Sequence, residues 1–270
     1  MLQGYPEVHE MDLRDSRCST RYDTRLTSTV SQAMRLNKHI SDTGYCSRRE
    51  ADRLIGEGRV TVNGQRGRVG SEVGEGDTVQ IDGQTLKART AVKGQRRHVY
   101  IALNKPVGVT STTEADVKDN IVDLVDHAQR IFPIGRLDKD SEGLILLTSN
   151  GDIVNAILRA ENKLEKEYLV VVNRQVTDDF LRGMSRGVPL DGETTLPCKT
   201  GKLGRNGFRI VLVQGLNRQI RLMAAYFGLR VKQLLRVRIG NIKLGHLKPG
   251  KWRNLTDAEL RGLLPGHDDW

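Results

Sequence analysis

The sequence predicts a two-domain protein in which each domain combines helices with strands. Its 270 residues suffice for one large or two modest domains with substantial hydrophobic cores. Residues 34–87 contain two short helical patterns followed by short strand patterns, and strand-like apolar runs resume near residue 99. A stretch rich in Lys, Arg and Gln separates these regions. We therefore expect one domain at 33–90, a linker at 91–98 and a second domain at 99–265.

The first 32 residues differ from the rest of the chain. They contain four Arg, five acidic residues and scattered Ser and Thr, with no sustained apolar periodicity. Such a composition buries too little apolar surface to offset the conformational entropy lost on folding. We expect residues 1–32 to form a disordered leader. Met34 begins the first patterned segment and is a candidate translation start.

The first domain is predicted to begin with two short helices. Leu36 and Ile40 are four residues apart, which places both on one helix face, and Gly44 supplies a stop. Ser47 and Glu50 then match a capping box, in which each side chain accepts a hydrogen bond from an otherwise unpaired backbone N–H. The second helix should therefore start directly after Ser47.

Short strands are predicted after these helices. Residues 60–62 alternate apolar and polar side chains and run into an Asn-Gly pair at 63–64, a strong signal for a tight hairpin turn. Val69, Val73 and residues 77–83 are expected to add further β-structure. Two short helices and a small sheet fit within this domain.

The second domain is predicted around two apolar strands. Residues 99–105 resemble a strand that should stop at Pro106, because proline cannot donate to a β-ladder. Residues 144–148 are almost wholly apolar, as in a strand buried on both faces. The charged loop 132–143 lies directly before this strand. That position would hold a carboxylate rigidly at the floor of a cleft.

Two carboxylates of this loop, Asp138 and Asp140, are candidates for chemistry. An Asp-x-Asp pair can bind a metal ion and a sugar nucleotide, as in some glycosyltransferases. Such short acidic pairs also occur in ordinary solvated turns. The residues alone leave both interpretations open.

The first domain resembles the S4 RNA-binding domain over its whole length. The matching segments are residues 35–38, Gly44, 46–51 and 58–64. The resemblance implies a small α/β module that binds RNA, and the basic residues expected to contact it are Arg35, Lys38, Arg48, Arg49 and Arg53. Arg49 and Arg53 are four residues apart, so their guanidinium groups should follow one exposed helix face suited to phosphate oxygens. A merely solvated helix face is the alternative.

The loop of the second domain resembles the catalytic segment of the RsuA family of RNA pseudouridine synthases. The family hallmark Gly-Arg-Leu-Asp is complete at residues 135–138, and the resemblance extends from residue 34 to about residue 262. It implies that Asp138 is the catalytic aspartate and that Asp140 has no catalytic role. It also implies that Tyr168 stacks on the target base, that Arg221 pairs with Asp138, and that Leu234 lines the pocket.

The same resemblance implies the fold and the partners. It implies an α+β catalytic domain built on a mixed, mostly antiparallel sheet, with the cleft across its middle and no metal or cofactor. The substrate would be a specific uridine in a 23S ribosomal RNA stem-loop, with a tyrosine tRNA uridine as a second candidate. Further RNA contacts are expected from Lys105, Arg136, Asn217, Arg218, Gln219, Arg236 and Arg238.

The charge of the chain fits a polyanionic partner. The formal net charge is +10, and residues 194–256 contain 14 Lys or Arg and no Asp or Glu. The three cysteines lie far apart, which argues against a disulfide framework or a zinc site. No apolar run approaches the length of a membrane span, and no signal-peptide core is present. We expect a cytoplasmic monomer that does not bind membranes.

Two other function classes compete with RNA isomerisation. A non-catalytic RNA-binding factor of ribosome assembly would need only the S4-like domain and a basic face. A metal-dependent glycosyltransferase would use Asp138 and Asp140 and would lose activity with a chelator. A pseudouridine synthase predicts no such loss.

Overall fold

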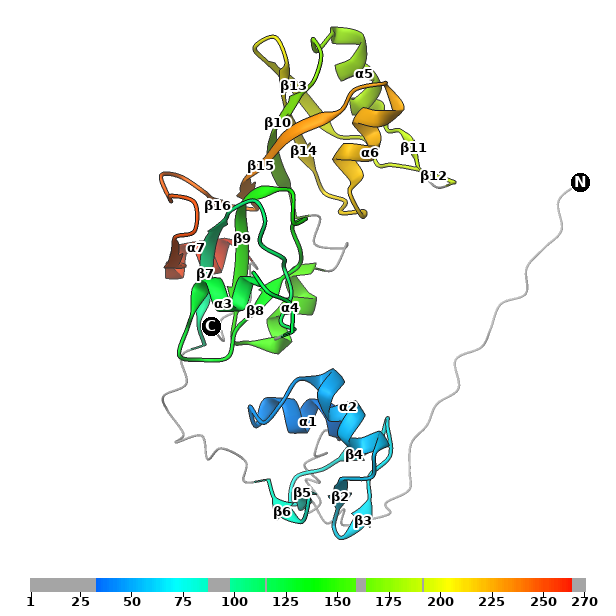
Figure 1. The fold of residues 1–270 in the computed structure, drawn as a ribbon, viewed down its shortest axis with the longest axis vertical. Coiled ribbons are helices and arrows are strands. Elements are labelled where there is room, and N and C mark those ends of the chain that lie inside the picture. The colour runs from blue at the N-terminus through cyan, green and yellow to red at the C-terminus, as the bar shows by residue number, and fades with distance from the viewer. Residues whose placement is uncertain (1–32, 87–97, 115, 159–163, 191, 264–270) are drawn as a thin grey trace, which may run out of the picture. The chain divides into compact units, whose positions relative to one another are not determined.

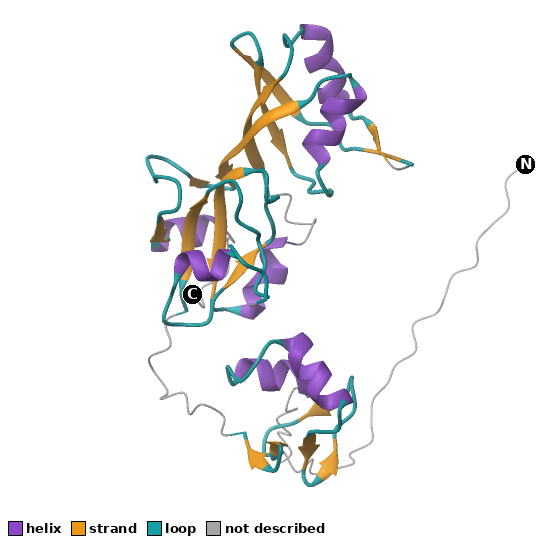
Figure 2. Ribbon diagram, in the orientation of Figure 1, coloured by secondary structure: helices purple, strands orange, loops and turns teal. Residues whose placement is uncertain are grey.

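The structure is a computed structural model in which residues 33–86, 98–114, 116–158, 164–190 and 192–263 are described. The chain divides into two compact units, residues 1–90 and 91–270 (Figure 1). The predicted leader 1–32, the linker residues 91–97 and residues 264–265 lie outside the described residues. Figure 2 shows that both units combine helices with strands, as the sequence predicts.

Two helices, α1 (Leu36–Asp42) and α2 (Arg48–Gly56), belong to the first unit. Leu36 and Ile40 are both buried, and α1 ends before Gly44, whose φ is +80°. The Ser47 hydroxyl accepts a hydrogen bond from the Glu50 N–H at 3.1 Å, so the predicted N-cap is confirmed. The Glu50 carboxylate accepts hydrogen bonds from Arg53.

The strands of the first unit are short. One antiparallel sheet has the order β3-β2-β5-β6, and β1 pairs separately with β4. Their bounds are β1 (Met34–Arg35), β2 (Val60–Val62), β3 (Gln65–Arg66), β4 (Glu72–Val73), β5 (Val79–Ile81) and β6 (Gln84–Thr85). Asn63 and Gly64 both have positive φ, at 51° and 79°, as a two-residue hairpin turn requires.

The prediction of β-structure at Val69 is wrong. Val69 lies in a turn and is 63% exposed. The backbone N–H of Ser71 donates to the Arg68 carbonyl, and the Ser71 hydroxyl accepts from the Arg68 N–H. These two bonds close the chain on itself around Val69, so no strand can pair there.

The second unit is built on a nine-stranded sheet. Its main path is β13-β14-β10-β15-β9-β7-β17, with β16 beside β15 and β8 beside β9. Only the pair of β15 and β9 is parallel among the strand pairs of the described sheet, which confirms the predicted mixed, mostly antiparallel sheet. The bounds are β7 (Tyr100–Lys105), β8 (Phe132–Ile134), β9 (Glu142–Thr148), β10 (Lys166–Val172), β13 (Lys199–Leu203), β14 (Gly207–Leu212), β15 (Val231–Ile239), β16 (Ile242–Lys243) and β17 (Trp252–Asn254).

Five helices and a small hairpin surround this sheet. The helices are α3 (Ile121–Val125), α4 (Gly151–Leu158), α5 (Asp178–Arg186), α6 (Gln219–Tyr226) and α7 (Asp257–Leu263), and the hairpin strands are β11 (Pro189–Leu190) and β12 (Glu193–Thr194). In Figure 1, α5 and α6 lie beside β10, β14 and β15, whereas α3 and α4 lie near β7, β8 and β9. No described helix has the length and apolarity needed to cross a membrane.

Hydrophobic side chains cover both faces of the central strands. On β7, Ile101 and Leu103 join one core cluster, whereas Tyr100 and Ala102 join another. Residues 144–147 of β9 alternate between the same two clusters, as the period of two along a strand dictates. Each fully buried Leu or Ile contributes about 2 kcal/mol relative to an exposed one. The predicted doubly buried strand is therefore confirmed, and β7 ends before Pro106 as expected.

The parallel junction of β9 and β15 divides the sheet into two halves. It consists of two residue pairs, Leu235 with Glu142 and Arg236 with Gly143. Gly143 has φ of +106°, and a Cβ atom there would lie 2.3 Å from the Arg236 carbonyl oxygen. Only glycine permits this close approach.

Candidate active site

A pocket of about 320 Å³ opens in the second unit where the two half-sheets meet. Its lining comes from the loop before β9, from β10 and β15, and from the start of α6. All four residues expected to be catalytic line it: Asp138, Tyr168, Arg221 and Leu234. Segments separated by about 100 residues therefore meet at one cavity, which is large enough for a single nucleobase.

The backbone, rather than side-chain contacts to the carboxylate, holds the Asp138 loop in place. The Ser111 hydroxyl donates to the Leu137 carbonyl at 2.7 Å and accepts from the Leu137 N–H at 3.3 Å. The Ser141 N–H donates to the Asp138 carbonyl at 3.1 Å. Leu137 is buried, which anchors the loop, and Asp138 is half-buried. No described residue forms an ion pair with the Asp138 carboxylate, so its oxygens face the pocket without a counter-ion.

The predicted ion pair between Arg221 and Asp138 is wrong for this structure. Arg221 Nη2 donates to the Asp140 carbonyl at 2.8 Å and to the Ser141 hydroxyl at 3.0 Å. Arg221 Nε lies 3.4 Å from Asp140 Oδ2. Because α6 approaches the loop from the Asp140 side, the guanidinium group of Arg221 reaches the carboxylate of Asp140 instead of that of Asp138.

Asp140 is bound by a second arginine. Arg218 donates to both Asp140 carboxylate oxygens, at 3.2 and 3.0 Å. Although burial opposes the effect, the Arg218 and Arg221 guanidinium groups hold the pKa of Asp140 below its usual value. A carboxylate already bound by two guanidinium groups is a poor ligand for a cation. Among the described residues, no group of three His, Cys, Asp or Glu side chains could hold a metal ion.

Tyr168 and Leu234 lie on neighbouring strands that form the pocket wall. Tyr168 of β10 is 9% exposed, and Leu234 of β15 is 5% exposed. The cross-strand partner of Tyr168 is Arg236, whose guanidinium carbon lies over the Tyr168 ring, 6.0 Å from its centroid. Cation–π contact therefore fixes the ring that faces the pocket.

The residues expected to contact RNA in the second unit have two different environments. Arg136 and Arg218 are exposed and line the pocket, and Asn217 is exposed directly beside Arg218, so RNA can reach all three. Gln219 is buried, and its side chain accepts from the Leu216 N–H and donates to Gln214. Gln219 therefore holds the turn that presents its two exposed neighbours.

Three further residues expected to contact RNA are buried or half-buried in this structure, so they are not part of its exposed basic surface. Lys105 has no exposed surface, because it ends a strand buried on both faces and its ammonium group donates to two backbone carbonyls. Arg236 is 4% exposed and donates to the carbonyls of Leu144 and Arg136. Arg238 is held by the carboxylates of Glu165 and Glu167.

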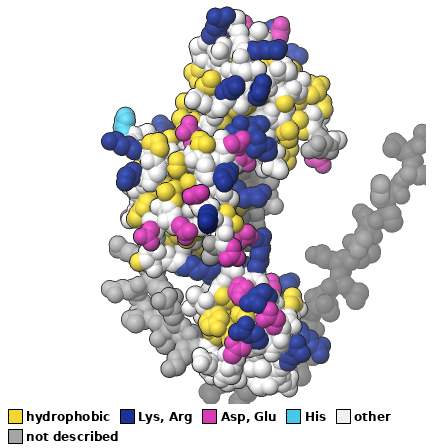
Figure 3. Space-filling view, viewed as in Figure 1, with side chains coloured by type: hydrophobic (Ala, Val, Ile, Leu, Met, Phe, Trp, Pro, Cys, Tyr) yellow, Lys and Arg dark blue, Asp and Glu magenta, His cyan; other side chains and the backbone are white. Residues whose placement is uncertain are grey.

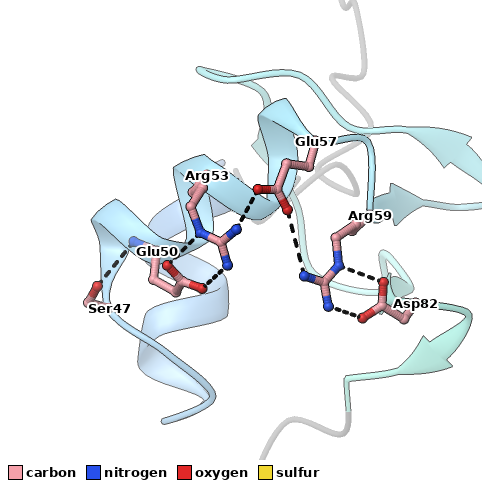
Figure 4. Close-up of polar contacts among 6 residues, drawn as sticks. All are labelled: Ser47, Glu50, Arg53, Glu57, Arg59 and Asp82. Carbon is pink, nitrogen blue, oxygen red and sulfur yellow. Dashed lines mark hydrogen bonds and ion pairs between the residues drawn. The ribbon is translucent and has the colours of Figure 1, made fainter. Parts of the chain in front are cut away.

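Of the basic residues expected to bind RNA in the first unit, Lys38 is half-buried and the others are exposed, and both Lys38 and Arg53 form ion pairs. Arg35, Arg48 and Arg49 are exposed. Lys38 pairs with Asp42 at 2.7 Å. Arg53 pairs with Glu50 and Glu57, so the predicted row of guanidinium groups is partly neutralised (Figure 4).

Two residues of the site had no assigned role in the sequence. Lys166 lines the pocket at the start of β10, two residues before the expected motif tyrosine. Ser111 does not line the pocket, but it holds the Asp138 loop from a segment 26 residues upstream. Lys166 and Glu167 are the charged residues that open the otherwise apolar strand β10, so the sequence marks Lys166, whereas nothing in the sequence around Ser111 signals its contact.

Positive side chains predominate around the pocket. The charged residues of its described lining are five cations and one acid, Asp138; the cations are Arg136, Lys166, Arg218, Arg221 and Arg236. In the part of this unit where Figure 1 labels β10, β13 and β14, Figure 3 shows more dark-blue Lys and Arg side chains than magenta Asp and Glu side chains.

Models of two known protein families match the sequence of this chain. A family model described as RNA pseudouridylate synthase matches residues 99–226, and an S4 domain model matches residues 34–79. The dual-specificity RNA pseudouridine synthase RluF of Escherichia coli is 56% identical over 232 residues, which are 86% of this chain and 79% of that protein. This chain belongs to the RNA pseudouridine synthase family.

Two further comparisons agree with this assignment. An uncharacterised RNA pseudouridine synthase of Aquifex aeolicus is 39% identical over 240 residues, 86% of this chain and 94% of that protein. A crystal structure of a pseudouridylate synthase has a TM-score of 0.63 and 27% identity, covering 86% of this chain and 100% of the other. The chain is an RNA pseudouridine synthase with an S4 RNA-binding domain, so the glycosyltransferase and non-catalytic interpretations are set aside.

Proposed function

We propose that this pseudouridine synthase isomerises a specific uridine in 23S ribosomal RNA. The observation that carries the proposal is one pocket of base size lined by Asp138, Tyr168 and Leu234. Its 56% identical relative is a dual-specificity enzyme. Dual specificity in a relative is consistent with a second substrate here, and we propose a uridine of tyrosine tRNA for that role.

Asp138 would act at the sugar of the target nucleotide. Isomerisation breaks the N1–C1′ bond, rotates the uracil and joins C5 to C1′; C5 then loses its proton and N1 gains one. A carboxylate can attack C1′ or remove a sugar proton, and in either route it stabilises positive charge near C1′. The backbone bonds to Ser111 and Ser141 hold the loop while leaving this carboxylate open to the pocket.

Tyr168 and Leu234 would retain the uracil while it rotates. The detached base has no covalent bond to the RNA at that stage, so its position depends on surrounding contacts. A flat ring and an apolar side chain on adjacent strands form a wall against which the base can rotate in its own plane, and their contacts oppose its escape. Arg236 fixes the Tyr168 ring, and the pairing of β10 with β15 fixes the spacing of the two side chains.

Arg221 would position the catalytic loop. Its hydrogen bonds to the Asp140 carbonyl and the Ser141 hydroxyl clamp the segment directly after Asp138 onto α6. Bonds from a guanidinium group are charge-assisted and therefore stronger than neutral ones. The arginine thus acts on Asp138 through the backbone.

The basic surface would stabilise a flipped-out nucleotide. Removing a base from its stack costs a few kcal/mol. Arg136 and Arg218 lie exposed at the mouth of the pocket, where phosphate contacts can offset that cost. The S4 domain would add contacts to RNA outside the target loop. Since ribosomal RNA is cytoplasmic, we also propose that the enzyme works there, as a monomer.

Mapping pseudouridines in ribosomal RNA and tRNA from cells with and without this gene tests the proposal. We expect one 23S site, and a tRNA site, to lose pseudouridine in its absence. Both should return with the wild-type chain but not with Asp138→Asn. Unchanged 23S modification in the deletion would overturn the ribosomal assignment, and an unchanged tRNA site would restrict the enzyme to ribosomal RNA.

A further inference from the structure

Three buried or half-buried cations form a cluster in which Lys166 and Arg236 line the pocket and Lys105 interacts with Arg236. Lys105 is fully buried, Arg236 is 4% exposed, and Lys166 is half-buried. Among the described residues, none of the three forms an ion pair. A buried charge is normally paired, because removing it from water is costly. This cluster therefore requires an explanation.

Backbone carbonyls supply the hydrogen bonds of all three cations. The Lys105 ammonium donates to the carbonyls of Pro106 and Val109, both at 2.9 Å. The Lys166 ammonium donates to those of Leu164 and Val213, both at 3.2 Å. A carbonyl satisfies an N–H group but carries no net charge, so the positive charge of each side chain is not neutralised.

Arg236 is the least satisfied member of the cluster. Its Nε donates to the Leu144 carbonyl at 2.6 Å and its Nη1 to the Arg136 carbonyl at 3.4 Å. Its Nη2 is buried and has no hydrogen-bond partner among the described residues. An unpaired buried donor costs about 1–3 kcal/mol, more for a charged group.

The cations act on one another. Burial, and then repulsion from Arg236, lowers the pKa of Lys105 to about 8, although Asp138, Asp140 and Glu142 oppose the effect. Burial and repulsion from Arg236 also lower the pKa of Lys166. Arg236 therefore acts on both lysines, so the three cations form one electrostatic cluster.

We propose that Lys105, Lys166 and Arg236 stabilise the negative charge of the uracil once it has detached from the sugar. When the N1–C1′ bond breaks, its electron pair leaves with the base, which becomes an anion delocalised over N1, O2 and O4. The positive charge at C1′ is taken by Asp138 in the attack route, or lost as a sugar proton in the other. A fixed positive potential favours that anion in both routes. The inference rests on the proposed function of the pocket.

The location of the cations favours the base over an RNA phosphate as the anion. Phosphates remain on the RNA backbone outside the pocket, where the exposed arginines Arg136 and Arg218 lie. Lys166 and Arg236 line the pocket together with Tyr168 and Leu234, which form the wall against which the uracil would lie. A charge in such a dry site acts more strongly than one in water.

Single-turnover rates with two RNA stem-loops test this inference. One carries uridine at the target position and the other carries 5-fluorouridine, whose fluorine itself stabilises the detached anion. Because C5 of 5-fluorouridine carries no proton to lose, the rate measured for both RNAs is that of N1–C1′ bond cleavage. Lys166→Met, which keeps an unbranched side chain but removes the charge, should slow the uridine RNA about tenfold or more. The same variant should lower the single-turnover rate for the 5-fluorouridine RNA less than about threefold and should change the Kd for RNA less than about twofold.

Matched variants separate charge from structure. Arg236→Met should show the same selective slowing, and Arg236→Lys should restore most of the uridine rate because the charge is retained. Arg182→Met, which removes an exposed cation from α5, should leave both rates unchanged. Thermal unfolding identifies any variant that fails to fold.

Two results would overturn the inference. One is equal slowing of both RNAs by Lys166→Met and Arg236→Met. The other is a raised Kd with an unchanged rate, which would assign the cations to phosphate binding. Turnover of the uridine RNA by the wild-type chain tests the proposed function separately, because the inference depends on the ratio of the two slowings.

Discussion

In the S4 unit, Arg53 and Arg59 lie on the surface and pair with neighbouring carboxylates. In the catalytic unit, by contrast, Lys105, Lys166 and Arg236 are buried or half-buried and form no ion pair among the described residues. Figure 4 shows Arg53 between Glu50 and Glu57, and Arg59 between Glu57 and Asp82. Around the pocket, the three buried cations donate to backbone carbonyls instead. Lys and Arg side chains therefore have different roles in the two units.

The difference separates structural charge from functional charge. Exposed ion pairs contribute about 0–1 kcal/mol each, and they leave little potential to attract an anion. Buried unpaired cations cost stability, and that cost persists only where surrounding structure enforces it. The number of Lys and Arg residues in a domain is thus a poor guide to where it acts on RNA.

The largest effect should follow from removing the one acidic group of the pocket lining. Asp138→Asn should lower pseudouridine formation at least about 1,000-fold, because an amide neither attacks C1′ nor removes a proton. RNA affinity should stay equal or become tighter, since a negative charge leaves a basic pocket. Asp140→Asn is the matched control and should lose about tenfold, since Asp140 acts through Arg218 and Arg221. Retained turnover in Asp138→Asn would reject the assignment of the catalytic carboxylate.

The next largest effect should arise at the junction of β9 and β15, where Gly143 pairs with Arg236. Gly143→Ala should destabilise the catalytic unit by about 3 kcal/mol, because its Cβ would collide with the Arg236 backbone and its φ is positive. Gly201→Ala on β13 is the control, because no atom lies within 4 Å of its added Cβ. Urea denaturation measures both. Similar midpoints for the two variants would show that the junction tolerates a side chain.

A paired group within the catalytic unit should make stability depend on pH. The Arg209 guanidinium, followed by that of Arg238, lowers the pKa of Glu167 to about 2. A lowered carboxyl pKa stabilises the fold above the unfolded pKa near 4.5, and this contribution disappears as pH falls toward about 2. We expect a loss of about 2 kcal/mol over that range. Urea denaturation at several pH values should show a shallower decline for Glu167→Gln, and identical slopes would contradict it.

The smallest effect should compare one arginine from each unit. Arg136→Gln should lower the salt dependence of RNA binding by about one unit of slope, because an exposed pocket arginine contacts one phosphate. Arg53→Gln should change that slope by less than about half a unit, because its two glutamates already neutralise it. Equal changes in slope for the two variants would show that Arg53 breaks its ion pairs with Glu50 and Glu57 in order to bind RNA.

Local patterns allowed much of the fold to be predicted from the sequence. The Ser47 cap, the Asn63-Gly64 turn and the strand before Pro106 each depend on residues close together in the chain. Asp138, Tyr168, Arg221 and Leu234 do line one pocket, although their roles remain proposals.

What could not be predicted depends on contacts between distant residues. Whether Lys105 reaches solvent depends on the strands on either side of it, and whether Arg221 meets Asp138 or Asp140 depends on the approach of α6. Val69 has a strand-forming side chain, but the Ser71 turn overrides that preference. Motifs identify which residues matter, whereas packing decides what each one touches.

The two-residue junction of β9 and β15 has a consequence for when the enzyme is competent. Asp138 belongs to the half-sheet of β9, whereas Tyr168 and Leu234 belong to the half-sheet of β15. Opening those two residue pairs, together with the bonds from Arg218 and Arg221 to the segment after Asp138, would separate the aspartate from the pocket walls while each half kept its own strand pairing. Catalytic activity therefore depends on the junction of β9 and β15. A molecule in which only this junction is open would keep its secondary structure and still be inactive.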